Sequence, residues 1–273
     1  MERIPFIAVL IVLLFVTPAF SADTVYFRSG MEVSSDYEQI KRVDRRHLQS
    51  SDSPTFLSAV GRLRIIQTNG KVSYCTAFPP DFAGNRSEIR YFHTSAHCLL
   101  DPETRLPLDT QSIQWSTFVD GWRLLQAHVD VERVDPPNDV AVLKARQALS
   151  RDIIKPLTVT SVEHLTGGKL MIAGYHGDIG NNGMRMAIDN NVPKNGVVIE
   201  SGRTIVDTVA FTGSSGGPVL LVENKSKPVV VGMIRGNGRK DKQYLVNGQR
   251  GSDRVEITPS KWILASLKGF EEL

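Results

Sequence analysis

The stretch "AFTGSSGGPVLL", residues 210–221, places three glycines and two adjacent serines between two apolar runs. Glycine loses more backbone entropy on folding than other residues, which makes it costly in ordinary positions. Because it has no Cβ, it is favoured where the main chain takes a positive φ or closely approaches another group. The pattern indicates either a backbone shaped for a task or an ordinary glycine-rich turn between two strands. The rest of the sequence has to distinguish these two interpretations.

Composition predicts a globular, mostly β protein. The chain has 273 residues, of which 41% are hydrophobic and 22% charged. Its 22 glycines and 14 prolines separate short runs rich in Val, Ile, Leu and Thr, a pattern typical of all-β domains. About a dozen such runs can form two small barrels or one sandwich. Only the closing stretch, 258–270, has helical spacing. The net charge of +3 is small and the basic residues are scattered, so we expect no nucleic-acid partner.

The N-terminus resembles a secretory signal. Residues 4–16, "IPFIAVLIVLLFV", are a largely apolar run, and "AFSA" follows at 19–22. This pattern predicts a signal peptide over residues 1–21, although Glu2 offsets the charge of Arg3. The run is short for a bilayer span, so we expect no membrane attachment after cleavage. The sequence therefore predicts a secreted or periplasmic protein.

Export places the cysteines in an oxidising compartment. Cys75 and Cys98 are the only two, so one disulfide is favoured over two buried free thiols. Neither lies in a Cys-x-x-Cys pair, which disfavours a zinc site. Residues 22–53 are polar and include the dibasic pair Arg45-Arg46. We interpret this segment as a linker, a propeptide or an extended arm, and residues 54–273 as the folded domain.

Three segments carry side chains suited to nucleophilic catalysis. His97 lies in "HTSAHCLL", Asp139 lies in "PPNDVAVLKA", and Ser215 lies in the glycine-rich stretch. Taken singly, they also fit a core histidine, an aspartate that caps a strand and a turn. A serine hydroxyl needs a base, and the base needs an acid to orient it. The order His, Asp, Ser is that of chymotrypsin-like enzymes.

The segments "TSAHC", "NDVAVLK" and "GSSGGP" resemble the active-site motifs of the trypsin/chymotrypsin family, and the resemblance runs from about residue 56 to the C-terminus. It implies two antiparallel Greek-key β-barrels, over 54–155 and 156–273, with a C-terminal helix. It also implies that His97 is the general base, Asp139 its orienting partner and Ser215 the nucleophile. The N–H groups of Gly213 and Ser215 would form the oxyanion hole.

The departures from the pancreatic enzymes favour another branch of the family. Ser214 stands where those enzymes have an aspartate, and "AGYHGD" at 173–178 is similar to a segment of the bacterial V8-like glutamyl endopeptidases. By the same resemblance, the primary specificity pocket would be lined by Val209, Ala210, Arg235 and Gly236. We expect a preference for small or medium apolar side chains, and the alternative is an acidic preference through Arg235.

The sequence thus predicts an exported serine endopeptidase that acts on polypeptides as a monomer and without a cofactor. The alternatives are a catalytically silent relative with a binding or regulatory role, and an esterase that uses the same triad. A zinc pair of His93 and His97 is disfavoured because the glutamate of His-Glu-x-x-His is missing. Residues 178–189 faintly match a calcium loop, but a surface turn is the favoured interpretation.

Overall fold

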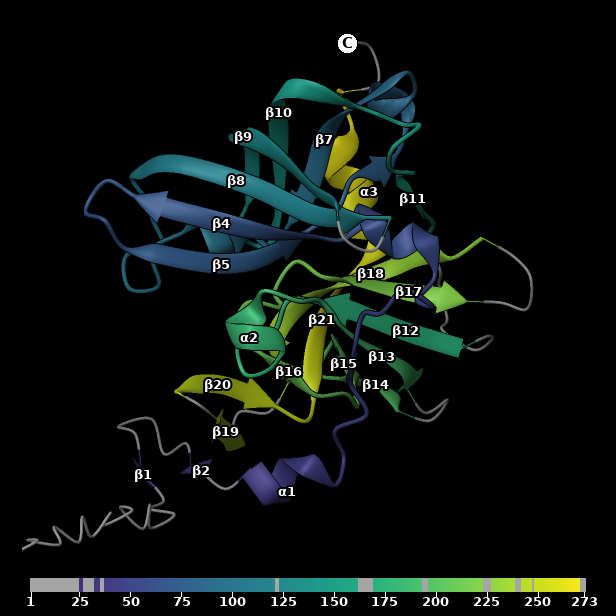
Figure 1. Ribbon diagram of the computed structural model, residues 1–273. Coiled ribbons are helices and arrows are strands. Elements are labelled where there is room, and N and C mark those ends of the chain that lie inside the picture. The colour runs from purple at the N-terminus through teal and green to yellow at the C-terminus, as the bar shows by residue number, and fades with distance from the viewer. Residues whose placement is uncertain are drawn as a thin grey trace, which may run out of the picture.

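The computed structural model describes residues 25–26, 32–34, 37–120, 123–161, 169–192, 196–222, 227–238, 242–246 and 248–270 (Figure 1). The predicted signal peptide, 1–21, lies outside these residues. As the sequence predicts, the fold is mostly β, with two curled, barrel-like sheets and a helix near the C-terminus. No helix in the described part of the chain is long and apolar enough to cross a membrane.

The first barrel is built from antiparallel neighbours in the order β5-β4-β8-β9-β10-β7. The turn between β4 and β5 contains Gly70 at φ 82°, and the pair Asn69-Gly70 is typical of tight hairpin turns. At the two edges, Phe78 and His93 form a β-bridge that curls the sheet toward closure. The strands of this barrel are β4 (Gly61–Gln67), β5 (Val72–Ala77), β7 (Glu88–Thr94), β8 (Thr110–Val119), β9 (Arg123–Asp135) and β10 (Val140–Ser150).

Alternating burial along the strands places one face of this sheet inside the barrel. In β4 every second residue is buried, including Leu63 and Ile65, and β8 contributes Ile113 and Trp115 to the same cluster. Side chains on a strand alternate between its two faces, so this pattern fills the barrel with apolar groups.

The second barrel follows the order β14-β15-β21-β18-β17-β12-β13. Residues 178–189, interpreted above as a surface turn, contain the short element α2 (Gly180–Gly183) and the start of β13, and the aspartates at both ends are buried. The strands are β12 (Lys169–Gly174), β13 (Ala187–Val192), β14 (Val197–Glu200), β15 (Arg203–Val206), β17 (Pro218–Val222), β18 (Val229–Asn237) and β21 (Val255–Pro259). A smaller sheet beside it contains β1 (Val25–Tyr26), β2 (Glu32–Ser34), β16 (Ala210–Phe211), β19 (Lys242–Val246) and β20 (Gln249–Ser252).

A short connecting strand belongs to both halves. Strand β11 (Leu157–Val159) pairs in parallel with β6 (Pro80–Asp81) of the first half and with β18 of the second. An apolar cluster between the barrels includes Phe78, Val140 and Met233, together with Ile263 of the C-terminal helix α3 (Ser260–Leu267). The predicted helix is therefore present, but Phe270 lies beyond its end, where it packs against Tyr91.

Residues before the first barrel pack against the second. They include the short helix α1 (Tyr37–Lys41), and strand β3 (His47–Leu48), which pairs with β13. The remaining short elements are α2 (Gly180–Gly183), η1 (Thr55–Ala59), η2 (Ala83–Asn85) and η3 (Ala96–Leu99). Figure 1 shows the two barrels as separate layers, with α3 on the side of the first barrel.

Candidate active site

Antiparallel pairing of β7 with β10 brings His97 close to Asp139. Thr94, at the end of β7, is opposite Ala141, near the start of β10. His97 follows on the single turn η3, and Asp139 directly precedes β10. Asp139 has φ 54°, in the left-handed region that aspartate tolerates better than most residues. Two distant segments therefore meet because a register of backbone hydrogen bonds aligns them.

The contact between these side chains fixes the orientation of the imidazole. The Nδ1 atom of His97 lies 2.9 Å from Oδ2 and 3.1 Å from Oδ1 of Asp139. The backbone N–H of His97 also donates to Oδ1, at 2.9 Å. Asp139 is buried, whereas the side chain of His97 is 34% exposed. With Nδ1 directed at a carboxylate, Nε2 is the ring atom left to exchange protons with a substrate group.

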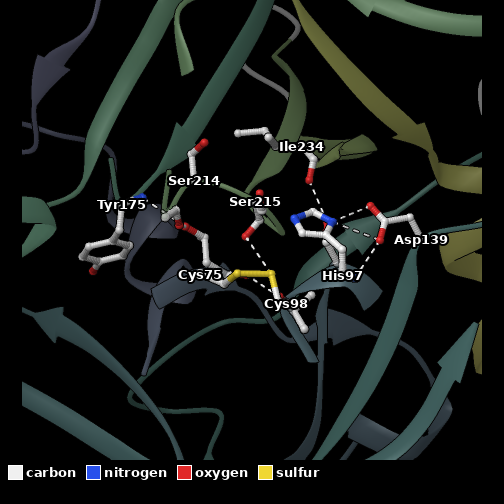
Figure 2. Close-up of a disulfide and its surroundings, with 12 residues drawn as sticks. Cys75, His97, Cys98, Asp139, Tyr175, Ser214, Ser215 and Ile234 are labelled. Atoms are coloured by element: carbon white, nitrogen blue, oxygen red, sulfur yellow. Dashed lines mark hydrogen bonds and ion pairs between the residues drawn. A yellow bond between two sulfur atoms is a disulfide. The ribbon is translucent and has the colours of Figure 1, made fainter. Parts of the chain in front are cut away.

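The disulfide Cys75–Cys98, which the sequence predicts, lies beside the main chain of the serine, with Sγ of Cys98 4.0 Å from the carbonyl oxygen of Ser215. Cys98 follows His97, and Cys75 precedes Thr76, whose N–H donates to the carbonyl of Ser215 at 2.7 Å. In the view of Figure 2 the ring of His97 lies between Ser215 and Asp139. The disulfide therefore connects the segment that carries the histidine to the strand that holds the main chain of the serine.

The glycines of the opening stretch have the conformations that their loop requires. Gly213 has φ +99°, and a Cβ there would lie 2.6 Å from the carbonyl oxygen of Tyr175. Gly216 has φ +85°, and a Cβ there would lie 2.1 Å from the carbonyl oxygen of Thr76. Neither position can hold another residue without strain or a clash. The cluster is thus a backbone arrangement that needs glycine, and not only a flexible turn.

Two amide groups of this loop remain available for a ligand. The N–H groups of Ser214, Gly216 and Gly217 donate to backbone carbonyls of Phe211, Ile234 and Ser214 respectively. Among the described residues, the N–H groups of Gly213 and Ser215 have no such acceptor. An oxyanion hole needs two donors of this kind, held in place before the reaction.

A cavity of about 380 Å³ opens beside this loop. It is lined by Ser215 and His97 and, among the predicted specificity residues, by Ala210 and Gly236. A Cβ at Gly236 would meet no atom within 4 Å, so this wall is open. The described lining does not include Val209 or Arg235; Val209 is buried with Phe211 in a neighbouring apolar cluster.

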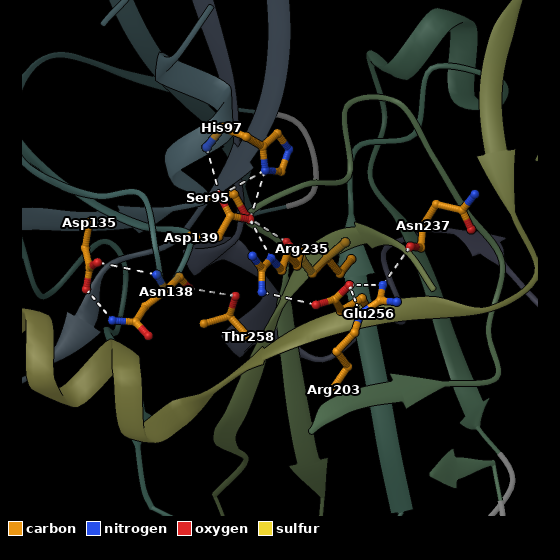
Figure 3. A network of polar contacts seen from close by, with 11 residues as sticks. Ser95, His97, Asp135, Asn138, Asp139, Arg203, Arg235, Asn237, Glu256 and Thr258 are labelled. Atoms are coloured by element: carbon orange, nitrogen blue, oxygen red, sulfur yellow. Dashed lines mark hydrogen bonds and ion pairs between the residues drawn. The ribbon is translucent and has the colours of Figure 1, made fainter. Parts of the chain in front are cut away.

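Arg235 belongs instead to a chain of alternating charges behind the aspartate (Figure 3). Its Nε lies 3.7 Å from Oδ2 of Asp139, and its Nη1 lies 3.1 Å from Oε1 of Glu256. The other carboxylate oxygen of Glu256 pairs with Arg203. The carboxylate that orients His97 therefore has a cation on its other side, and that cation is in turn paired with a second carboxylate.

The second histidine of the disfavoured zinc pair is a core residue. His93 is fully buried, with Nε2 2.8 Å from Oγ of Ser266. Burial lowers the pKa of His93 to about 3, so this imidazole is neutral at physiological pH. Within the described residues, no group of three or more His, Cys, Asp or Glu side chains could hold a metal ion.

Comparison with known proteins identifies the family. The family model described as "Trypsin-like peptidase domain" matches residues 82–233. The chain belongs to this family. No curated protein sequence matches the chain significantly.

Solved structures show that this chain shares its fold with bacterial proteases. Protease Anisep from Arthrobacter nicotinovorans has a TM-score of 0.59 at 13% identity, and the match covers 81% of this chain and 99% of that protein. The thermostable serine protease AL20 from an extremophilic microorganism has a TM-score of 0.54 at 14% identity, covering 79% and 100% respectively. At these identities the likeness is one of fold.

The sequence patterns did not indicate the charged residues that support this site. Glu256 and Arg203 lie in strands whose residue types gave no sign of a role. In the sequence, Arg46 was notable only as part of the dibasic pair Arg45-Arg46. In the structure, its side chain is 1% exposed and pairs with Asp178. The nearby Asp44 was the only local signal of an ion pair.

Proposed function

We propose that this protein is a serine endopeptidase that cleaves polypeptides through an acyl-enzyme at Ser215. The observation that carries the proposal is the combination of the His97–Asp139 contact with the unpaired N–H groups of Gly213 and Ser215, beside one cavity. Membership of the trypsin-like peptidase family supports the same assignment.

Each group has a definite part in the proposed reaction. The hydroxyl of Ser215 attacks the carbonyl carbon of the peptide, and Nε2 of His97 takes its proton. The N–H groups of Gly213 and Ser215 bind the oxyanion, and loss of one such donor typically costs about 3 kcal/mol of transition-state stabilisation. His97 then protonates the leaving amine, and the C–N bond breaks. Water, deprotonated by His97, hydrolyses the ester and restores Ser215.

The proposed substrate preference is for small or medium apolar side chains. Ala210 and the open wall at Gly236 leave room without supplying a charge. An acidic preference through Arg235, as in the V8-like subtype, is less well supported because this guanidinium contacts Asp139 and Glu256. A profile of cleavage over a peptide library distinguishes the two, since an acidic preference gives cleavage after Glu or Asp.

The proposed enzyme needs no new N-terminus docked beside its nucleophile. Ser214 is buried, and its hydroxyl donates to the carbonyl of Phe211 at 2.8 Å. A serine hydroxyl offers no charge to an incoming ammonium group, and burial of an unpaired ammonium would cost several kcal/mol. Acetylation of the α-amino group should therefore leave turnover unchanged.

Export is part of the proposal. The disulfide Cys75–Cys98 is typical of oxidising compartments, and residues 1–21 carry the signal-peptide pattern. The expected mature N-terminus lies near residue 22, and the mass of the protein recovered outside the cytoplasm tests this. A mass that includes residues 1–21 would contradict it.

A fluorophosphonate probe tests the nucleophile directly. We expect the wild type to be labelled at Ser215, and Ser215→Ala and His97→Ala to lose both labelling and peptidase activity. Ser214→Ala is the matched control, because it removes the neighbouring hydroxyl and should remain labelled. Hydrolysis of small esters with no cleavage across a peptide library would indicate an esterase. Absence of labelling in the folded wild type would refute the proposal.

A further inference from the structure

Residues 37–53, which begin with α1 and precede the first barrel, form a segment that we call the N-terminal strap. Ile40 of α1 is fully buried in a cluster that also contains Val209 and Phe211. Strand β3 extends the second barrel through β13, and the N–H of Gln49 donates to the carbonyl of Met186 at 2.9 Å. The strap is therefore packed and hydrogen-bonded as part of the second barrel.

Arg46 has the most buried side chain among the ion-paired residues of the strap. Its guanidinium bonds both carboxylate oxygens of Asp178, at 2.9 and 2.6 Å, and also both oxygens of Asp44. Its Cζ lies 5.0 Å from the centre of the Phe211 ring. Burial disfavours the charge, but the hydrogen bonds to the two carboxylates outweigh that effect and raise the pKa of Arg46. Loss of Arg46 would take from the buried Asp178 the guanidinium that bonds both of its carboxylate oxygens, which is costly in a site of this kind.

Asp178 belongs to a short segment, 176–178, that is hydrogen-bonded to residues 211 and 212, just before Gly213. The N–H of Gly177 donates to the carbonyl of Thr212 at 2.8 Å, and the N–H of Phe211 donates to Nδ1 of His176 at 3.3 Å. Thr212 directly precedes Gly213. The direction of the Gly213 N–H therefore depends on the contacts of residues 176–178. Arg46 holds this segment in place through its hydrogen bonds to Asp178.

We propose that Arg46 is a positioning residue for the oxyanion hole. Through Asp178 and the Phe211 ring it holds the main chain of 211–213, so that the Gly213 N–H points toward the position of the oxyanion. This inference rests on the proposed peptidase function. It makes the strap a permanent part of the catalytic unit, in contrast to a propeptide that is removed.

The neighbouring arginine supplies a matched comparison. Arg45 pairs with Asp189 at 3.0 Å and donates to the carbonyl of Asp207 at 2.7 Å. It thus ties the strap to the same barrel by a similar ion pair but bonds no residue of 176–178 or 211–213. Both members of the dibasic pair are occupied by such contacts, which makes this site unsuitable for cleavage in the folded chain.

The test compares Arg46→Met with Arg45→Met in the full-length chain. For Arg46→Met we expect kcat to fall by about 10- to 100-fold, approaching the loss of one oxyanion donor, while KM changes by less than about threefold. The affinity for a peptide boronate, whose tetrahedral adduct uses the same hole, should fall in parallel with kcat/KM. Arg45→Met should keep kcat within about threefold of the wild type, which separates positioning from general anchoring of the strap.

Two further variants keep the test informative if Arg46→Met is unstable. Arg46→Lys keeps the charge but loses the fork that bonds both oxygens of Asp178, so kcat should fall by a smaller factor. Arg46→Met combined with Asp178→Asn also removes the buried carboxylate whose charge Arg46 balances. This double variant should regain part of the melting temperature without regaining kcat.

The outcomes separate the two proposals. An active wild type, with Arg46→Met and Arg46→Lys as fast as Arg45→Met, overturns the positioning role and leaves the peptidase function standing. A folded wild type that is not labelled at Ser215 overturns both. Recovery of kcat together with stability in the Arg46→Met/Asp178→Asn variant also overturns the positioning role, because it assigns the effect to stability alone.

Discussion

Removal of the disulfide is expected to destabilise the protein by an amount that follows from its position in the chain. Cys75 and Cys98 are separated by 23 positions. In the chain-entropy estimate, closing a loop of that length in the unfolded chain contributes about 3.4 kcal/mol at 25 °C. For a protein of this size, that corresponds to a fall in melting temperature of about 7 to 14 °C.

The effect on activity should depend on temperature. The contact of His97 with Asp139 depends on the pairing of β7 with β10, which the disulfide does not make. We therefore expect near-normal turnover at 25 °C in the variant that combines Cys75→Ala with Cys98→Ala. Activity should then disappear on heating at the lower melting temperature of that variant.

The assay is urea and thermal unfolding of the wild type and the double variant, each with and without a thiol reductant. The reductant should lower the stability of the wild type to that of the variant and leave the variant unchanged. A loss below about 1 kcal/mol would refute the entropic reasoning. Equal sensitivity of both proteins to the reductant would show that it acts elsewhere.

Three further predictions concern the glycine-rich loop at Gly213, the buried histidines and the ion pairs of Arg235. Gly213→Ala, which places a side chain at φ +99° against a backbone oxygen, should reduce kcat by about 100-fold or more while the protein still folds, measured by peptide cleavage and circular dichroism. Burial lowers the pKa of His93 to about 3 and that of His176 well below its ordinary value, so the unfolded chain takes up protons first as the pH falls below about 6.5. Protonation of His93 should therefore decrease the free energy of unfolding by about 1.4 kcal/mol per pH unit between about pH 6.5 and 3, and His176 acts in the same direction. Urea titrations in which His93→Gln does not flatten this slope would contradict the assignment. Arg235→Gln removes the cation 3.7 Å from Asp139 and one of the two arginines that pair with Glu256. The free energy of unfolding, measured in urea, should fall by no more than about 1 kcal/mol because the Arg235 side chain is partly exposed. A loss of several kcal/mol would show that solvent does not screen this contact.

Much of the fold could be predicted because its information is local. Alternation of apolar residues marks strands such as β4 and β8, and the Asn-Gly pair marks the turn at Gly70. The order of His97, Asp139 and Ser215 could be recognised because each lies in a short motif. The strand β13 was missed because its polar residues Asp189–Asn191 hide the alternation.

The supporting charges could not be predicted because their partners are distant in sequence. Arg46 and Asp178 are 132 positions apart, and nothing in either segment specifies the other. Arg235 was interpreted as a substrate-binding residue because its place in the chain is near the pocket wall. Its side chain lies with Asp139 and Glu256 instead, and this direction depends on the packing of β18 against β21.

The double pairing of β11 bears on how the two barrels can move. Residues that join two domains often act as a hinge, but here backbone hydrogen bonds tie the connection to both sides. Rotation of one barrel relative to the other would break at least one of these ladders. The histidine and the serine come from different barrels, so this rigidity keeps them aligned in the absence of substrate. Variation among related sequences in what they cleave should then arise from exposed loops around the cavity and not from opening of the cleft, and a chain divided within 157–159 should reassemble poorly from its two fragments.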